Sequence, residues 1–96
     1  MNIGGAIGKV RKQKKISQGD LAKLANLNQS YLSQIENNKK TPNVKTIAEI
    51  AKALDVPVSM LFLFSINENE IPEKKRDVFN ALMPVMESLF DEYYIK

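Results

Sequence analysis

The sequence contains no cysteine and no histidine, and these two absences exclude whole classes of chemistry. Without cysteine there is no disulfide framework and no thiolate metal site. Without histidine the commonest general base and the commonest metal ligand are missing. The carboxylates that remain, such as Asp20 and Glu49, stand at positions typical of helix caps and helix surfaces. We therefore expect no enzyme, no metal site and no cofactor.

Long hydrophobic runs are also missing. No apolar stretch approaches the roughly 18 residues of a membrane span. The N-terminal stretch MNIGGAIGKVRK lacks the unbroken apolar core and the cleavage site of a signal peptide. We therefore expect a soluble, cytoplasmic protein with no membrane partner. Its 96 residues suit one compact domain with an appendage.

Charge is distributed unevenly along the chain. Residues 1–64 carry ten Lys and Arg against four Asp and Glu, while residues 65–96 carry four against seven. The net charge of +3 is thus the sum of +6 and −3. A basic first part and an acidic last part suggest that the first part meets a polyanion, but a solvated basic surface explains the same charges equally well.

Apolar spacing predicts an all-α chain. Apolar residues recur at intervals of three and four, the period of a helix, and no strand-like alternation occurs. We predict a five-helix domain at residues 1–64, a polar linker at 65–72 and a C-terminal helical segment at 73–96. The helices expected in the first domain cover residues 3–15, 17–25, 28–37, 44–54 and 57–64.

Polar residues mark the expected helix ends. Ser17, Asn28 and Asn43 stand at N-cap positions, and Asn26 suits a left-handed turn residue. The apolar residues between them supply the sides that we expect to be buried. These are Leu21, Ala22, Leu24 and Ala25 in the second helix, Tyr31, Leu32 and Ile35 in the third, and Val44, Ile47, Ile50, Ala51 and Leu54 in the fourth.

Glycine and proline predict two local irregularities. Each of Gly4, Gly5 and Gly8 weakens a helix by about 1 kcal/mol relative to Ala, so we expect either fraying before Gly8 or a close backbone contact. Pro84 lies in the middle of the last helix and frees the carbonyl of Asn80. We therefore expect the last helix to be kinked or split at Pro84.

The third expected helix has an unusual outer surface. Its outward positions are almost all amides or hydroxyls, although Lys and Glu are better helix formers than Ser and Asn. Together with the short helix before it, it forms two short helices joined by a turn of three to four residues, a unit that many DNA-binding proteins share. Helical hairpins of this size also occur in bundles that bind no DNA.

Residues 6–64 resemble the lambda-repressor-like, Cro-type helix-turn-helix family, also called the xenobiotic-response-element family. The pattern SQ-x-x-LA followed by YLSQIEN carries the resemblance. It implies a five-helix domain from a prokaryotic or phage-infected cell, which usually acts as a dimer and reads operator DNA through its third helix. The family often has Gly where Asn26 and Asn38 stand, and Asn tolerates the same left-handed backbone.

The resemblance implies which side chains meet DNA. A recognition helix presents its N-terminal residues to base edges in the major groove, and amides suit paired contacts with adenine. The candidates for base contact are Gln29, Ser30, Ser33, Gln34 and Asn28, of which Asn28 serves equally well as a helix cap. The candidates for phosphate contact are Gln18, Arg11, Asn37, Lys39, Lys40, Lys45 and Lys9. In related proteins an arginine matching Arg11 pairs with the glutamate matching Glu36, so we expect that ion pair here.

The C-terminal segment exposes a wide apolar face that requires a cover. Its apolar residues repeat at intervals of 3, 4, 3 and 4, and Val78, Val85 and Phe90 broaden this seam. We expect it to form a homodimer through Phe79, Leu82, Met86, Leu89, Phe90 and Tyr93. Packing on its own domain is one alternative. An antitoxin-like role is another, in which this helix binds a partner protein while the first domain binds double-stranded DNA.

Overall fold

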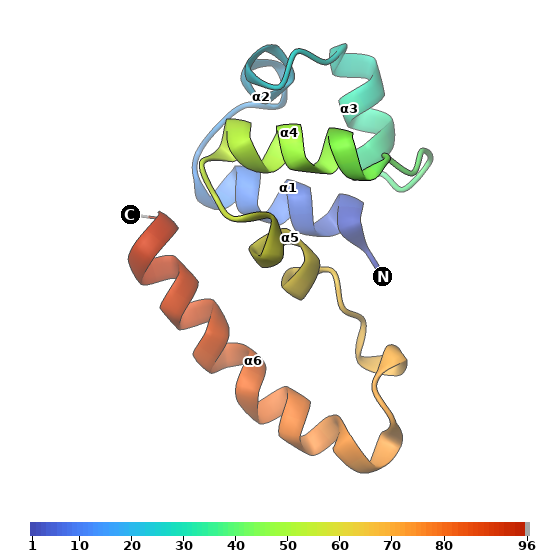
Figure 1. The fold of residues 1–96 in the computed structure, drawn as a ribbon, viewed down its shortest axis with the longest axis vertical. Helices are drawn as coiled ribbons and strands as arrows, with labels where there is room; N and C mark the ends of the chain where they lie inside the picture. Colours follow the sequence, from blue (N-terminus) through green and yellow to red (C-terminus); the bar gives the residue numbers. More distant parts are fainter. Residues whose placement is uncertain (96) are drawn as a thin grey trace.

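The computed structural model describes residues 1–95, and within this range it contains helices and no strand (Figure 1). This confirms the predicted all-α class. The α-helices are α1 (Ile3–Gln13), α2 (Gln18–Leu24), α3 (Gln29–Glu36), α4 (Val44–Leu54), α5 (Val58–Phe64) and α6 (Arg76–Phe90). Short 3₁₀ turns cover Glu68–Glu70 and Glu73–Lys75, and a π-helical turn at Asp91–Ile95 follows α6. Residue 96, the last of the segment expected at 73–96, lies outside the described range.

Helices α1 to α5 form the body of the molecule and enclose one apolar core (Figure 1). Every one of these helices contributes fully buried side chains, so the amphipathic stripes of the sequence meet at a common centre. The largest fully buried apolar side chains are Ile7, Val10, Leu21, Leu32, Ile35, Ile50, Leu54, Met60 and Leu61. None of the described helices is both long enough and apolar enough to cross a membrane.

The caps and turns lie where the sequence places them. Asn28 Oδ1 accepts a hydrogen bond from the Ser30 N–H at 2.8 Å, and Asn43 Oδ1 accepts one from the Thr46 N–H at 2.8 Å. Asn26 has φ = 57°, the left-handed value that lets the chain turn sharply between α2 and α3. Asn26 and Asn28 thus shape the turn between the two helices of the helix-turn-helix unit, and Asn43 marks the start of α4.

The glycines of α1 make a close backbone contact. A Cβ atom on Gly4 would lie 2.0 Å from the carbonyl oxygen of Ile35, which is far inside van der Waals contact. The absence of a side chain thus lets the start of α1 abut the end of α3. Helix α1 begins at Ile3 without fraying before Gly8, and it ends at Gln13, two residues earlier than predicted.

Two apolar residues that were predicted to be buried lie outside the core. Leu24 is 63% exposed and Val44 is 72% exposed. Leu24 is the last residue of α2 and points away from the buried side that Leu21 and Ala25 share. Val44 is the first residue of α4, at the edge of its buried stripe. Apolar character alone therefore overestimated the width of both buried faces.

Helix α6 projects away from the body (Figure 1). It begins at Arg76 and continues through Pro84 to Phe90, so of the two expected irregularities at Pro84, a kink or a split, the split does not occur. Only its C-terminal half touches the body. There the Phe90 ring packs edge-on against Phe64, with ring centroids 5.7 Å apart, and Glu87 pairs with Lys9.

The linker before α6 is anchored to the start of the chain. The Asn2 N–H donates to the carbonyl of Ser65 at 2.7 Å, and Glu70 Oε1 lies 2.7 Å from the N-terminal amine. The ammonium group, together with a hydrogen bond from the Asn67 N–H, lowers the pKa of the Glu70 carboxyl. Residues 65–72 therefore follow a defined path across the body rather than a free one.

Candidate nucleic-acid interface

The outer side of α3 gathers uncharged hydrogen-bonding side chains. Gln29, Ser30 and Gln34 are exposed and Ser33 is half-buried, while the opposite side of the helix is anchored in the core. These four residues and Gln18, at the start of α2, line one shallow depression in the surface. The structure thus brings together four of the predicted base contacts and one predicted phosphate contact.

Two other predicted contacts are engaged in holding α3 itself. Asn28 uses its carbonyl oxygen to cap the helix. Asn37 Nδ2 donates to the carbonyl of Ser33 at 2.9 Å, at the last turn of α3. Both side chains therefore have a structural role in the free protein, and any contact with DNA is added to that role.

Arg11 and Glu36 form a two-pronged ion pair. Arg11 Nε donates to Glu36 Oε2 at 2.8 Å and Arg11 Nη2 donates to Glu36 Oε1 at 3.0 Å. The side chains are only 12% and 9% exposed, so water screens the pair weakly. Arg11 also donates to the carbonyl of Ile16 at 3.0 Å, and Gln18 Nε2 donates to Glu36 Oε1 at 3.3 Å. One carboxylate thus ties α1, the start of α2 and the end of α3 together.

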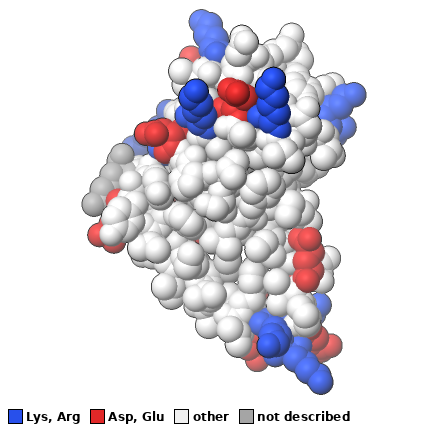
Figure 2. Space-filling view, viewed as in Figure 1, with Lys and Arg blue, Asp and Glu red and all other residues white. Residues whose placement is uncertain are grey.

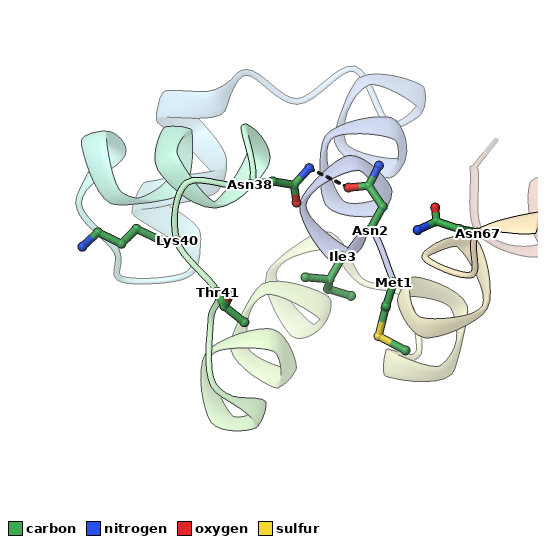
Figure 3. Close-up of a pocket in the computed structure, with 7 residues that line it drawn as sticks. All are labelled: Met1, Asn2, Ile3, Asn38, Lys40, Thr41 and Asn67. Carbon is green, nitrogen blue, oxygen red and sulfur yellow. Dashed lines mark hydrogen bonds between the residues drawn. The ribbon is translucent and has the colours of Figure 1, made fainter. Parts of the chain in front are cut away.

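The loop after α3 carries two exposed lysines on a fixed backbone. The N–H groups of Lys39 and Lys40 donate to the carbonyl of Gln34 at 2.8 and 3.2 Å, and Asn38 adopts φ = 60°. Asn38 Nδ2 donates to Asn2 Oδ1 at 2.8 Å, and Figure 3 shows that Lys40 extends away from this bond. The main chain therefore holds the lysines next to α3 while their ammonium groups remain in solvent.

The bond between Asn2 and Asn38 was missed by the sequence analysis. Asn2 Oδ1 also caps α1 by accepting from the Gly5 N–H at 2.9 Å. An Asn before a helix is a recognisable cap, but its second partner lies 36 residues away along the chain. No local pattern indicates that partner.

The remaining lysines differ in their surroundings. Lys9 Nζ lies 2.9 Å from Glu87 Oε1 and 4.9 Å from the centre of the Phe64 ring, so it is engaged by α6 and α5. Glu87 and Phe64 thus contact Lys9 in the free protein, and a phosphate contact by Lys9 stays a prediction. Lys45 is exposed at the start of α4 and borders the turn between α2 and α3.

The outer side of α3 presents hydrogen-bonding groups rather than a cluster of metal ligands. No group of three or more His, Cys, Asp or Glu residues suited to a metal ion occurs among residues 1–95. The outer side of α3 consists of amide and hydroxyl groups with cations nearby, and such a surface is suited to hydrogen-bonded recognition of a polyanion.

A comparison with protein families identifies the fold. The profile of a family described as "Helix-turn-helix" matches residues 7–61. The chain belongs to this helix-turn-helix family. The match ends within α5, so α6 lies beyond it, and the predicted resemblance to Cro-type helix-turn-helix proteins is confirmed for the body.

Similar proteins include regulators from phage and bacteria. The chain is 32% identical over 81 residues to the immunity repressor protein of Bacillus phage phi105, covering 84% of this chain and 54% of that protein. It is 40% identical over 60 residues to the HTH-type transcriptional regulator SinR of Bacillus subtilis, covering 62% and 54%. The chain thus spans about half the length of these two relatives.

Solved structures share the fold of the body. The restriction-modification controller protein C.AhdI from Aeromonas hydrophila superposes with a TM-score of 0.62 and 31% identity, over 64% of this chain and 92% of that one. The restriction-modification controller protein C.Esp1396I gives a TM-score of 0.62 and 33% identity, over 66% and 82%. At these identities the likeness extends beyond fold to part of the sequence.

Proposed function

We propose that this helix-turn-helix protein is a sequence-specific regulator of transcription that binds double-stranded DNA as a homodimer. In this proposal α3 enters the major groove and the protein represses the gene whose operator it covers. The observation that carries the proposal is the outer side of α3, where uncharged donors and acceptors line one depression and the exposed Lys39 and Lys40 follow directly along the chain.

The neutral groups are suited to reading bases. Gln29 and Gln34 each carry a donor and an acceptor, the pair that matches the N7 and N6 atoms of adenine. Lysine carries only hydrogen-bond donors and ionised glutamate only acceptors, so neither makes this paired contact. Ser30 and Ser33 are short enough to let the backbone of α3 approach the groove floor.

The charged groups are suited to holding the backbone of DNA. Lys39 and Lys40 lie exposed after the C-terminal end of α3, and Gln18 lies at the positive N-terminal end of α2. Phosphate contacts fix register without reading sequence. Arg11 keeps N–H groups beyond those bonded to Glu36 and Ile16, and one of these would complete the set while the ion pair stays intact.

The similar proteins support a repressor acting in a prokaryotic or phage-infected cell. One is named an immunity repressor and another a transcriptional regulator. A symmetric dimer places two recognition helices on successive turns of DNA, about 34 Å apart. The exposed apolar residues of α6 suit a second copy, and an antitoxin-like protein partner is the alternative occupant.

A selection on random duplexes tests the proposal. The full chain is incubated with a random duplex library at moderate salt, and bound duplexes are enriched and sequenced. We expect a short motif repeated with two-fold symmetry at a spacing of one helical turn. A reporter carrying that motif across its promoter is then expected to lose expression when the protein is produced. Binding without any enriched motif would overturn sequence-specific recognition.

A further inference from the structure

The apolar surface of α6 divides into two neighbouring faces. The inner face, with Phe79, Met86 and Phe90, is half-buried, and its Phe90 packs against Phe64. The outer face is turned away from the body, and its apolar members are between 45% and 71% exposed. They are Val78, Leu82, Val85, Leu89 and Tyr93. The seam expected from the sequence thus mixes residues of both faces, and the outer face has no cover within residues 1–95.

The outer face contains a row of four apolar residues that has the same pattern in both chain directions. Four of its apolar residues, Val78, Leu82, Val85 and Leu89, lie on one side of α6, and Tyr93 lies beyond the end of this helix. Lys75, in the 3₁₀ turn before α6, and Glu92, in the π-helical turn after it, flank this row of four, and the spacings from Lys75 to Glu92 are 3, 4, 3, 4 and 3. Reflection about the midpoint between Met83 and Pro84 exchanges apolar with apolar and cation with anion. The exchanged pairs are Leu82 with Val85, Val78 with Leu89, and Lys75 with Glu92.

We propose that this outer face, Lys75 to Glu92, binds the same face of a second copy with the two α6 helices antiparallel. The proposal rests on the homodimer proposed above and names the surface that forms it. In an antiparallel pair, Lys75 of each copy lies beside Glu92 of the other. In a parallel pair the same residues would face their own copies, and like charges in contact repel.

Figure 2 supports an apolar contact with charged ends. On the face that it shows, the middle of α6 presents almost no charged atoms, while basic atoms, with acidic atoms beside them, gather where α6 begins. Glu87 pairs with Lys9 of the body, so each body lies near the acidic end of its own α6. Antiparallel pairing therefore places the two bodies at opposite ends of about 25 Å of paired helix. This separation is of the same order as one turn of DNA.

Disulfide trapping tests the orientation, because the chain contains no cysteine. Val78→Cys and Leu89→Cys are produced separately, and each is oxidised alone and then as a mixture. The two positions are 11 residues, or about 16 Å, apart on one helix. A disulfide requires Cα atoms within about 7 Å. We expect little covalent dimer from either variant alone and a covalent heterodimer in most of the mixed sample.

A matched control uses the opposite side of α6. Asn80→Cys and Asp91→Cys are also exposed and also 11 residues apart, but they lie off the outer face. Their mixture is expected to give no covalent dimer. Efficient crosslinking of Val78→Cys with itself would show a parallel pair and overturn the proposal. Failure of the mixed Val78 and Leu89 variants to crosslink would show that another surface or another partner occupies this face.

Charge reversal supplies a second test that needs no cysteine. Lys75→Glu or Glu92→Lys alone is expected to weaken the dimer at least tenfold in sedimentation equilibrium, and the double variant is expected to restore it. No restoration would count against the antiparallel register. DNA binding by each reduced variant is measured on the selected duplex. Retained binding by a variant that fails to crosslink would reject this interface and leave the proposed function standing.

Discussion

Replacing Glu36 by glutamine should destabilise the fold and weaken DNA binding together. Glu36 accepts two hydrogen bonds from Arg11 and one from Gln18, and its side chain is only 9% exposed. Glutamine has the same shape, but its amide nitrogen cannot accept a bond, so Arg11 loses one acceptor and its counter-charge. A hydrogen bond to a charged group contributes about 1.5–3 kcal/mol. The expected loss is therefore about 2–3 kcal/mol of the free energy of unfolding.

The assay combines unfolding with binding. Urea denaturation followed by far-ultraviolet circular dichroism gives the free energy of unfolding, and a loss of this size lowers the melting temperature by about 10–20 °C for a domain of this length. Fluorescence anisotropy on the selected duplex gives affinity at a temperature where both proteins are folded. We expect binding to weaken at least about fivefold, because Arg11 and Gln18 lose the carboxylate that positions them.

A simple charge argument makes the opposite prediction. Removing a negative charge from a protein that binds a polyanion strengthens binding when the charge acts only at a distance. Glu49→Gln supplies that control, since Glu49 is exposed on α4 and loses the same charge. If Glu36→Gln were as stable as the wild type and bound DNA more tightly, as the control is expected to do, the positioning role of Glu36 would be refuted.

Three further comparisons test separate parts of the interface. Gln29→Ala should cost about 1–3 kcal/mol on the selected duplex only, whereas Lys40→Ala should weaken binding to all duplexes and lower the salt slope by about 1; a salt titration on matched and scrambled duplexes distinguishes them. Gly4→Ala should lower the melting temperature sharply because its Cβ would meet the backbone at the end of α3, whereas Gly8→Ala, whose Cβ would lie 3.3 Å from a side-chain oxygen, should be tolerated far better. Asn38→Gly keeps the left-handed backbone but removes the hydrogen bond to Asn2 at the start of α1. We expect an unchanged melting temperature and weaker binding to every duplex. An unchanged affinity would show that this hydrogen bond does not position Lys39 and Lys40.

Much of the body was predictable because its signals are local. Asn28 and Asn43 cap the helices that they precede, and Asn26 takes the turn conformation expected of it. A cap depends on residues two or three positions away, so the sequence contains both partners. The same holds for the exposed polar side of α3, where helical period separates Gln29 and Gln34 from the buried stripe.

The missed features depend on contacts between distant segments. Asn2 contacts Asn38 because α1 and α3 approach closely at Gly4. The glycines of the sequence indicate that some backbone lies close to α1, but they do not indicate that this backbone belongs to α3. The pairing of Lys9 with Glu87 of α6 was not predicted, and the phosphate contact expected of Lys9 stays a prediction. A lysine on a helix surface has the same local pattern in either case. The neighbour that decides its role comes from another part of the chain.

Helix α6 shows that apolar spacing predicts an apolar surface but not the segment that packs on it. Its apolar residues extend around more than one side of the helix, and a spacing of 3 and 4 can be traced along two adjoining lines of them. One of these two lines packs on the body, because Phe90 contacts the aromatic ring of Phe64. The other line, from Val78 to Leu89, is left exposed by that choice. Docking of the inner face thereby fixes the direction of the outer face, so the same contact that anchors α6 to its own body also sets the orientation of the surface that we propose for a second copy.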